Sequence, residues 1–580
     1  MTRSVLNRAV KRESRAAGSG SLRLRLLWLS LLLLCVASMT ACGDRARRRE
    51  AALAAAAGEA SVAAYQVQTE HARAKKAMAA PAAVMAPPAA GAYRMAGMTA
   101  APAPPPPSSF NTEEYSRIEA NRFLEVLKNP LSTFSIDVDT ASYANVRRYL
   151  SGGTLPPPDA VRIEELVNYF GYDYPQPRGD IPFAFSSELT DAPWQPGHKL
   201  LRIALQGRKI PTEQLPPANL VFLVDVSGSM AEANKLPLLV KSFKMLVRQL
   251  RPQDRVAIVT YAGQAGVALP SVAGSEKATI LAALDGLVAE GSTNGGEGIQ
   301  VAYRIAKEQF IKNGNNRVIL ATDGDFNVGV SGEGELVRLI ETKRNDGIFL
   351  SVLGVGMGDY KDSRMQKLAD RGNGNYAYLD NLMEAQKVLV RQFGGTMMAI
   401  AKDVKLQVEF NPAKVKSYRL IGYEKRALRN EDFADDKKDA GELGSGHTVT
   451  ALYEIELALP GAAGSQELTY QTTQVKEAAY RSDELALIRF RYKKPEGDDS
   501  VELVEKVSAS AVSLPQASEA TRFAAAVAEW GLLLQDAEDR GNASYQQVLE
   551  LARGARGADE HGDRSEFVRL VEAAEVIGKN

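Results

Sequence analysis

Five apolar residues lead directly into a polar loop in the stretch Leu220-Val-Phe-Leu-Val-Asp225-Val-Ser227-Gly228-Ser229-Met230. The apolar run is rich in β-branched residues, which predicts a strand buried on both faces of a parallel sheet. Ligand sites in open α/β sheets lie at the carboxyl ends of the strands, where Asp225, Ser227 and Ser229 would stand. Three oxygen ligands at alternate positions suit a small hard cation such as Mg²⁺, and Gly228 lets the backbone turn closely around it.

Two later segments have the residue types expected of further parts of this site. Gly291-Ser-Thr293-Asn-Gly-Gly opens a helical pattern, and Val318-Ile-Leu-Ala-Thr322-Asp323 is a second apolar strand that ends in an acid. In this order the three segments resemble the metal-ion-dependent adhesion site of the von Willebrand factor type A domain. The resemblance covers roughly residues 219 to 393.

The resemblance implies a ligand set and a mode of binding. Ser227, Ser229 and Thr293 are implied as metal ligands, and Asp225 and Asp323 hold the metal directly or through water. One coordination position is left for a Glu or Asp of a protein partner. The residue types agree, because neutral hydroxyls offset the charge of a cation only in part and leave it receptive to an outside anion. The expected ion is Mg²⁺, with Mn²⁺ or Ca²⁺ possible, and a turn merely capped by Ser and Asp is the alternative.

Strands and helices alternate through residues 218–395, as a doubly wound, mainly parallel and Rossmann-like sheet requires. Further strands are expected at 255–261, 348–355 and 376–379, an edge strand within 266–273, and helices at 278–287, 297–311, 335–344 and 382–393. Phe326 follows the second strand-end acid. An apolar ring on a polar rim is typical of an interface anchor, so we expect Phe326 to contact the partner.

The first 41 residues are predicted to be a lipoprotein signal peptide. Seven Arg and Lys residues precede an apolar run at 26–37 that is too short to span a bilayer. Met39-Thr-Ala-Cys42 resembles a bacterial lipobox, although the family usually has Leu where this chain has Met39. The resemblance implies cleavage before Cys42 and acylation of its thiol, and a plain secretory signal cut near Ala41 is the alternative. Gly43 favours the outer membrane, if the cell has one.

The segments around the central domain differ in composition. Residues 42–109 are rich in Ala and Pro and hold few large apolar side chains, which predicts a disordered tether. Residues 110–217 and 401–580 resemble, at Tyr172-Asp-Tyr-Pro and Gly446-His-Thr-Val-Thr-Ala-Leu-Tyr-Glu, the flanking modules of a bacterial subfamily of type A domain lipoproteins.

Alternating strands within 181–210 and 404–492 predict one β-sandwich, into which the central domain is inserted. Type A domains begin and end on the face opposite the metal, which agrees with such an insertion. Helical segments are expected at both ends of the body, at 161–170 and from 517 onward.

Other functions have less support in the sequence. The formal net charge is +0, which gives no case for a nucleic-acid partner. None of the four histidines lies within 218–395, so Ser227 and Ser229 have no imidazole base nearby in sequence. Asp137 and Asp139 form an Asp-x-Asp pair similar to that of haloacid-dehalogenase-type phosphotransferases, but the other motifs of that family do not follow, and we expect structural roles.

The sequence therefore predicts a non-enzymatic, membrane-anchored lipoprotein of the cell envelope, facing the periplasm or the exterior. It binds a protein partner through a divalent cation. A metal-dependent phosphohydrolase, and a structural envelope protein whose metal only stabilises the fold, are the alternatives.

Overall fold

The computed structural model describes residues 112–579, with gaps at 263–264, 292–294, 325, 327–331, 359, 393–394, 396–397, 439, 460–465, 468, 471, 496 and 498. The predicted signal peptide, Cys42 and the tether lie outside the described residues, and so does Thr293. All described residues belong to one structural unit.

A six-stranded sheet forms the middle of the central α/β domain, in the order β10-β9-β8-β5-β6-β7. All neighbouring strands pair in parallel except β6 and β7, which are antiparallel. The strands are β5 (Ala218–Asp225), β6 (Arg255–Tyr261), β7 (Ala265–Ala273), β8 (Asn315–Thr322), β9 (Ile348–Gly354) and β10 (Tyr376–Tyr378). β5 lies between β6 and β8 because it is apolar on both faces, with Phe222 in one hydrophobic core and Leu223 in the other.

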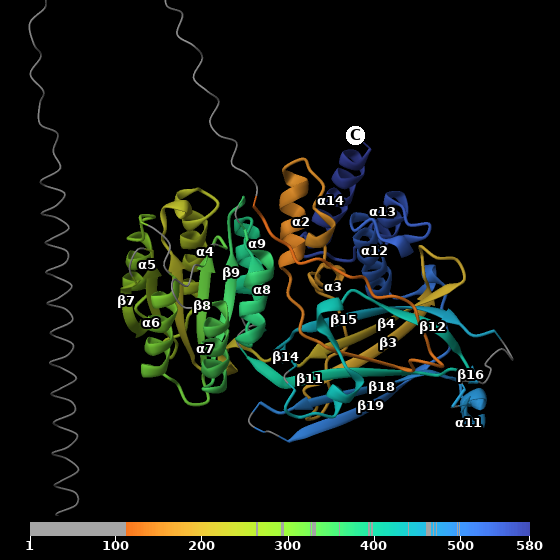
Figure 1. Cartoon of the computed structure of the whole chain (residues 1–580). Helices are drawn as coiled ribbons and strands as arrows, with labels where there is room; N and C mark the ends of the chain where they lie inside the picture. The colour runs from red at the N-terminus through yellow and green to blue at the C-terminus, as the bar shows by residue number, and fades with distance from the viewer. Residues whose placement is uncertain are drawn as a thin grey trace, which may run out of the picture. The chain divides into compact units, whose positions relative to one another are not determined.

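Helices cover both faces of this sheet (Figure 1). One core contains side chains of α4 (Leu236–Gln249), α5 (Lys277–Asp285) and α9 (Leu382–Gln386). The other contains side chains of α6 (Gly295–Glu308), α7 (Glu333–Asn345) and α8 (Asp362–Arg371). The expected doubly wound architecture is confirmed.

Two sheets build the β-sandwich beside this domain. The first has the order β1-β12-β15-β4-β3, and the second has the order β13-β2-β11-β18-β19, with β14 paired to β11. Rings from the two sheets stack between them, since the centroids of Phe410 and Tyr418 lie 4.2 Å apart. The strands are β1 (Leu124–Glu125), β2 (Leu131–Ser135), β3 (Phe183–Asp191), β4 (His198–Gly207), β11 (Ala399–Phe410), β12 (Val415–Ile421), β13 (Ala427–Leu428), β14 (Gly441–Gly444), β15 (Thr448–Leu457), β18 (Glu484–Lys493) and β19 (Ser500–Ser508).

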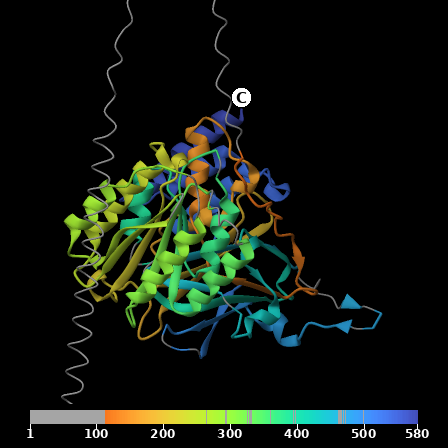
Figure 2. The same cartoon turned by 60° about the vertical axis from the view of Figure 1, so that its left-hand side comes forward.

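Strands from both sides of the central domain share each sheet of the sandwich. β4 pairs with β15 in antiparallel register, with Leu201 opposite Tyr453. In the other sheet β2 pairs with β11, with Phe134 opposite Leu406. The prediction that the central domain is inserted into one β-sandwich is therefore confirmed. A short hairpin, β16 (Gln466–Glu467) and β17 (Thr472–Thr473), projects from the sandwich near α11 (Glu477–Arg481) (Figure 2).

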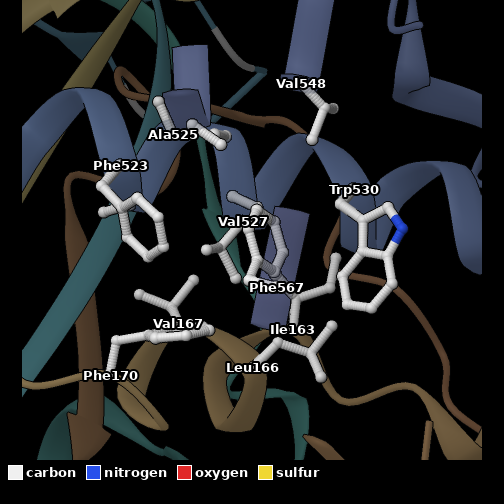
Figure 3. Close-up of a cluster of buried hydrophobic side chains, with 14 of the residues drawn as sticks. Ile163, Leu166, Val167, Phe170, Phe523, Ala525, Val527, Trp530, Val548 and Phe567 are labelled. Atoms are coloured by element: carbon white, nitrogen blue, oxygen red, sulfur yellow. The ribbon is translucent and has the colours of Figure 1, made fainter. Parts of the chain in front are cut away.

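Helices from the two ends of the body pack into a separate core (Figure 3). They are α2 (Ala141–Ser151), α3 (Ile163–Asn168), α12 (Glu519–Leu534), α13 (Tyr545–Gly554) and α14 (Asp563–Gly578). Phe170 packs edge-on against Phe523 at 4.9 Å, and Trp530 packs against Phe567 at 5.1 Å. The two flanking segments of the chain therefore form one core. Among the described residues, none of the helices combines the length and the hydropathy that a transmembrane span requires.

Candidate metal centre

Four of the five predicted metal ligands lie together at the carboxyl ends of β5 and β8. Ser227 Oγ and Ser229 Oγ are 3.1 Å apart, and Ser229 Oγ donates a hydrogen bond to Asp323 Oδ2 at 2.9 Å. The backbone N–H of Ser227 donates to Asp225 Oδ1 at 2.9 Å. Asp225, Ser227, Ser229 and Asp323 are called the strand-end site from here on.

Parallel pairing explains why these residues meet. β5 and β8 run side by side in register from Ala218 opposite Asn315 to Val224 opposite Ala321, so both strands end at the same edge of the sheet. This edge is where strand order reverses, with β6 on one side of β5 and β8 on the other. A topological switch point of this kind is the usual ligand position in open α/β sheets.

The fifth predicted ligand, Thr293, lies outside the described residues, but its flanking segment is connected to the site. The carbonyl of Gly291 accepts a hydrogen bond from the N–H of Gly228 at 3.0 Å. Next to it, the N–H of Glu290 donates to the carbonyl of Val226 at 2.7 Å. The loop that leads to Thr293 therefore begins alongside the Ser227–Ser229 turn.

The two carboxylates of the site are held away from water. Asp225 is fully buried and Asp323 is 3% exposed. Burial raises the pKa of Asp225, and the neighbouring Asp323 raises it further, while hydrogen bonds from Ser227 lower it. Two buried acids at one place favour a cation that offsets their charge.

A buried lysine that the sequence analysis did not identify also belongs to this site. Lys235 Nζ lies 3.1 Å from Asp323 Oδ2, and the lysine side chain is 5% exposed. Lys235 immediately precedes α4 and lies 88 residues before Asp323 in the chain. No motif in the sequence links these two residues. The ammonium supplies one fixed positive charge next to Asp323.

The donors present fit a hard divalent cation. The strand-end site offers two hydroxyl oxygens and two carboxylates, which is the oxygen chemistry that Mg²⁺, Mn²⁺ and Ca²⁺ prefer. Within the described part of the chain, no group of three or more His, Cys, Asp or Glu side chains is placed to hold a metal. The strand-end site differs from such groups because half of its donors are hydroxyls, which suit a hard cation.

The expectation that Phe326 contacts a partner is wrong for this structure. Its ring is fully buried and packs edge-on against Tyr261 at 5.3 Å. The ring also lies over the first residue of α6, because a Cβ added to Gly295 would come within 2.5 Å of it. The Phe326 side chain is therefore part of the hydrophobic core and not of an exposed rim, because burial of an apolar ring is favourable.

Asp137 and Asp139 have the structural environment expected of them. Arg426 donates to Asp137 Oδ2 at 3.1 Å and to Asp139 Oδ2 at 3.0 Å. Asp139 also accepts the backbone N–H of Tyr376 at 2.8 Å, which joins the segment after β2 to the start of β10. Asp139 therefore connects the sandwich to the central domain.

Family models match the central domain and the segments on both sides of it. The family model described as von Willebrand factor type A domain matches residues 219–392, that described as von Willebrand factor matches 109–202, and that described as the C-terminal part of the uncharacterized protein YfbK matches 395–577. A von Willebrand factor type A structure from Catenulispora acidiphila is 17% identical, with a TM-score of 0.37, over 65% of this chain and 88% of that one.

Two curated relatives are similar in sequence. The uncharacterized protein sll0103 of Synechocystis is 26% identical over 212 residues, which are 36% of this chain and 48% of that protein. The uncharacterized protein YfbK of Escherichia coli is 47% identical over 475 residues, which are 80% of this chain and 82% of YfbK. The chain therefore belongs to the YfbK family and carries a von Willebrand factor type A domain inserted between its flanking modules.

Proposed function

We propose that this protein binds an acidic side chain of a protein partner through a divalent cation at the strand-end site. Type A domains generally mediate protein–protein interactions, which supports a binding role. The observation that carries the proposal is the convergence of three side chains from two separate strand ends. Ser227 Oγ lies 3.1 Å from Ser229 Oγ, and Ser229 Oγ lies 2.9 Å from Asp323 Oδ2.

The residues of the site divide the work of binding between them. The hydroxyls of Ser227, Ser229 and Thr293 would hold the cation, and Asp225 and Asp323 would hold it directly or through water. The cation supplies a Lewis-acidic position for an outside carboxylate. Because the ammonium of Lys235 offsets one of the two carboxylates, the loaded site carries a net positive charge of about one, which favours an anionic partner group.

We also propose that the body is tethered to the cell envelope through an acylated Cys42, with the outer membrane favoured. The sequence features at residues 1–109 support this part. The first described residues run along the central domain, where the N–H of Thr112 donates to Gly358 and that of Glu114 donates to Tyr360, at 2.7 and 3.0 Å. A tether would therefore join the body next to the loop after β9.

A chelator experiment tests the binding role. The full-length chain is immobilised in detergent and exposed to an envelope extract with Mg²⁺, then washed with EDTA. A partner captured through the site is released by EDTA, and the Asp225→Ala, Ser229→Ala and Thr293→Ala variants do not capture it. Asp285→Ala on α5 is the control, because its 62% exposed carboxylate lies outside the site.

The same protein preparation distinguishes the proposed function from two alternatives, a phosphohydrolase and a protein whose metal is structural. A metal-dependent phosphohydrolase would hydrolyse p-nitrophenyl phosphate with Mg²⁺, and the proposal expects no turnover. A metal that only stabilises the fold would change the melting temperature on EDTA treatment while any captured partner stayed bound. Either result would contradict the proposed function.

A further inference from the structure

A polar cavity of about 640 Å³ lies between the central domain and the β-sandwich, away from the strand-end site. Its lining includes Arg317 near the start of β8, residues of α8, and the segments on either side of β13 and β14. Figure 1 shows α8 next to β14, where the two domains meet. A cavity of this size is within the range of small-molecule sites.

Arg317 is the unusual member of this lining. Its side chain is 4% exposed, and its Nε has no hydrogen-bond partner among the described residues. One guanidinium nitrogen donates to Ser351 Oγ at 2.6 Å, and the guanidinium carbon lies 5.6 Å from the centre of the Phe349 ring. It forms no ion pair with any described carboxylate. A buried guanidinium normally has an anionic partner, because an uncompensated charge in a protein interior is costly.

The electrostatics of Arg317 agree with this incomplete pairing. Burial lowers its pKa to about 10, and the nearby Glu442 opposes the shift only in part. Glu442 itself accepts a hydrogen bond from Asn373 at 3.2 Å. The group stays protonated at neutral pH and lines the cavity as a buried positive charge.

Two acids of the cavity wall form ion pairs with an arginine other than Arg317. Asp137 and Asp370 accept hydrogen bonds from Arg426 at 3.1 and 2.8 Å, so they share a guanidinium other than Arg317. Three further cations border the cavity on the sandwich side, namely Lys425, Lys437 and Lys438. The lining as a whole holds seven Lys and Arg side chains and three Asp and Glu side chains, so it has an excess of positive charge, and Arg317 is the least exposed of these cations.

We propose that this cavity binds a small molecule bearing a phosphoryl group, with Arg317 as the buried anchor and the three lysines as surrounding cations. A phosphoryl group carries nearly two negative charges and three acceptor oxygens, which match several donors at once. A carboxylate offers one charge and two oxygens and would leave more of the lining uncompensated. The planar guanidinium can donate two parallel hydrogen bonds to a phosphoryl group.

Isothermal titration calorimetry with inorganic phosphate tests this proposal. The full-length chain is titrated in EDTA at an ionic strength held constant with NaCl, so that the strand-end site takes no part. Wild type is expected to bind phosphate, and Arg317→Met is expected to bind it at least tenfold more weakly. Arg338→Met is the matched control, because Arg338 is an exposed arginine of α7 outside the cavity wall.

A second variant keeps the test valid if the Arg317→Met protein, which is changed at a buried position, fails to fold. Lys437 and Lys438 are exposed, so Lys437→Ser/Lys438→Ser should fold normally and bind phosphate several-fold more weakly. Equal phosphate affinity in wild type and Arg317→Met would overturn the proposal, as would the absence of binding to wild type at millimolar phosphate. Succinate that binds as tightly as phosphate would overturn the assignment of a phosphoryl ligand.

Discussion

The ammonium of Lys235 lies 3.1 Å from Oδ2 of Asp323, although Lys235 precedes α4 and Asp323 follows β8, 88 residues further along the chain. Glycine at position 356 makes room for this contact, because a Cβ there would lie 2.5 Å from Cε of Lys235. Gly356 also has a φ of +82°, a conformation that other residues rarely adopt. The strand-end site is therefore built around two carboxylates and one fixed ammonium.

Replacing the Lys235 ammonium should raise the affinity for the metal and lower the affinity for an acidic partner. Lys235→Met removes a positive charge that repels a divalent cation, so the affinity for Mn²⁺ measured by calorimetry should rise about tenfold. The loaded site then carries less positive charge, and capture of an acidic partner should weaken. Lys244→Met, on the partly exposed side of α4, is the control and should change neither. A fall in Mn²⁺ affinity in Lys235→Met would contradict this account.

The hydroxyl of Ser229 offers a test of the ligand set that leaves the core intact. Ser229 is exposed, so Ser229→Ala should keep the thermal midpoint of the metal-free protein within about 1 °C, since surface changes cost little. It should lower Mn²⁺ affinity about tenfold, because a ligand oxygen is lost. Ser275→Ala, at an exposed serine before α5, should bind Mn²⁺ like wild type. Unchanged Mn²⁺ affinity in Ser229→Ala would remove Ser229 from the ligand set.

Much of the fold was predictable because burial leaves a periodic signal in sequence. The apolar run from Leu220 to Val224 indicates a strand covered on both faces, and it is the central strand β5. The pairing of β4 with β15 could be expected, because both alternate like sandwich strands on either side of the insertion. Helix α8 was not predicted. Only a few of its residues, such as Met365 and Leu368, are buried and apolar, and the rest are mainly charged or polar.

The site was predictable only where a local motif carries it. Asp225, Ser227 and Ser229 lie within one turn, and Asp323 directly follows the neighbouring strand β8, so the motif and the parallel register together bring them to one place. The contact of Lys235 with Asp323 depends on space left by Gly356 from a third segment, which no local pattern reports. The burial of Phe326 likewise depends on Gly295, which leaves room for the ring.

Because Phe326 is buried, truncating its side chain should lower the stability of the fold. Phe326→Ala empties a buried site next to Tyr261 and should lower the free energy of unfolding by about 3–5 kcal/mol. Any loss of partner capture would then follow from lower stability of the core around Tyr261. Urea denaturation measures the effect. Phe310→Ala is the control, since that ring is 42% exposed and should cost much less. Equal losses in the two variants would mean that Phe326 is not packed as the structure shows.

A buried acid in α12 should make stability depend on pH. Glu529 is fully buried, accepts one hydrogen bond from the N–H of Ser544 at 3.0 Å, and has its pKa raised to about 8 by burial. In the unfolded chain the same carboxyl titrates near its ordinary value, at about 4.3. Between these two pH values the folded state therefore binds a proton that the unfolded state has released. Stability should be highest below the unfolded value and fall as pH rises through the folded one.

Glu529→Gln keeps the shape of this side chain and cannot ionise, so it should flatten the dependence of stability on pH between about 5 and 8. The loss across that range in wild type should be on the order of a few kcal/mol, because one unit of pKa shift corresponds to about 1.4 kcal/mol. Urea denaturation at several pH values measures it, and Glu550→Gln, an exposed acid on α13, should keep the wild-type dependence. A wild-type protein whose stability does not fall between pH 5 and 8 would show that Glu529 is ionised in the folded state, and that the core formed by α12, α13 and α3 admits water to its carboxylate.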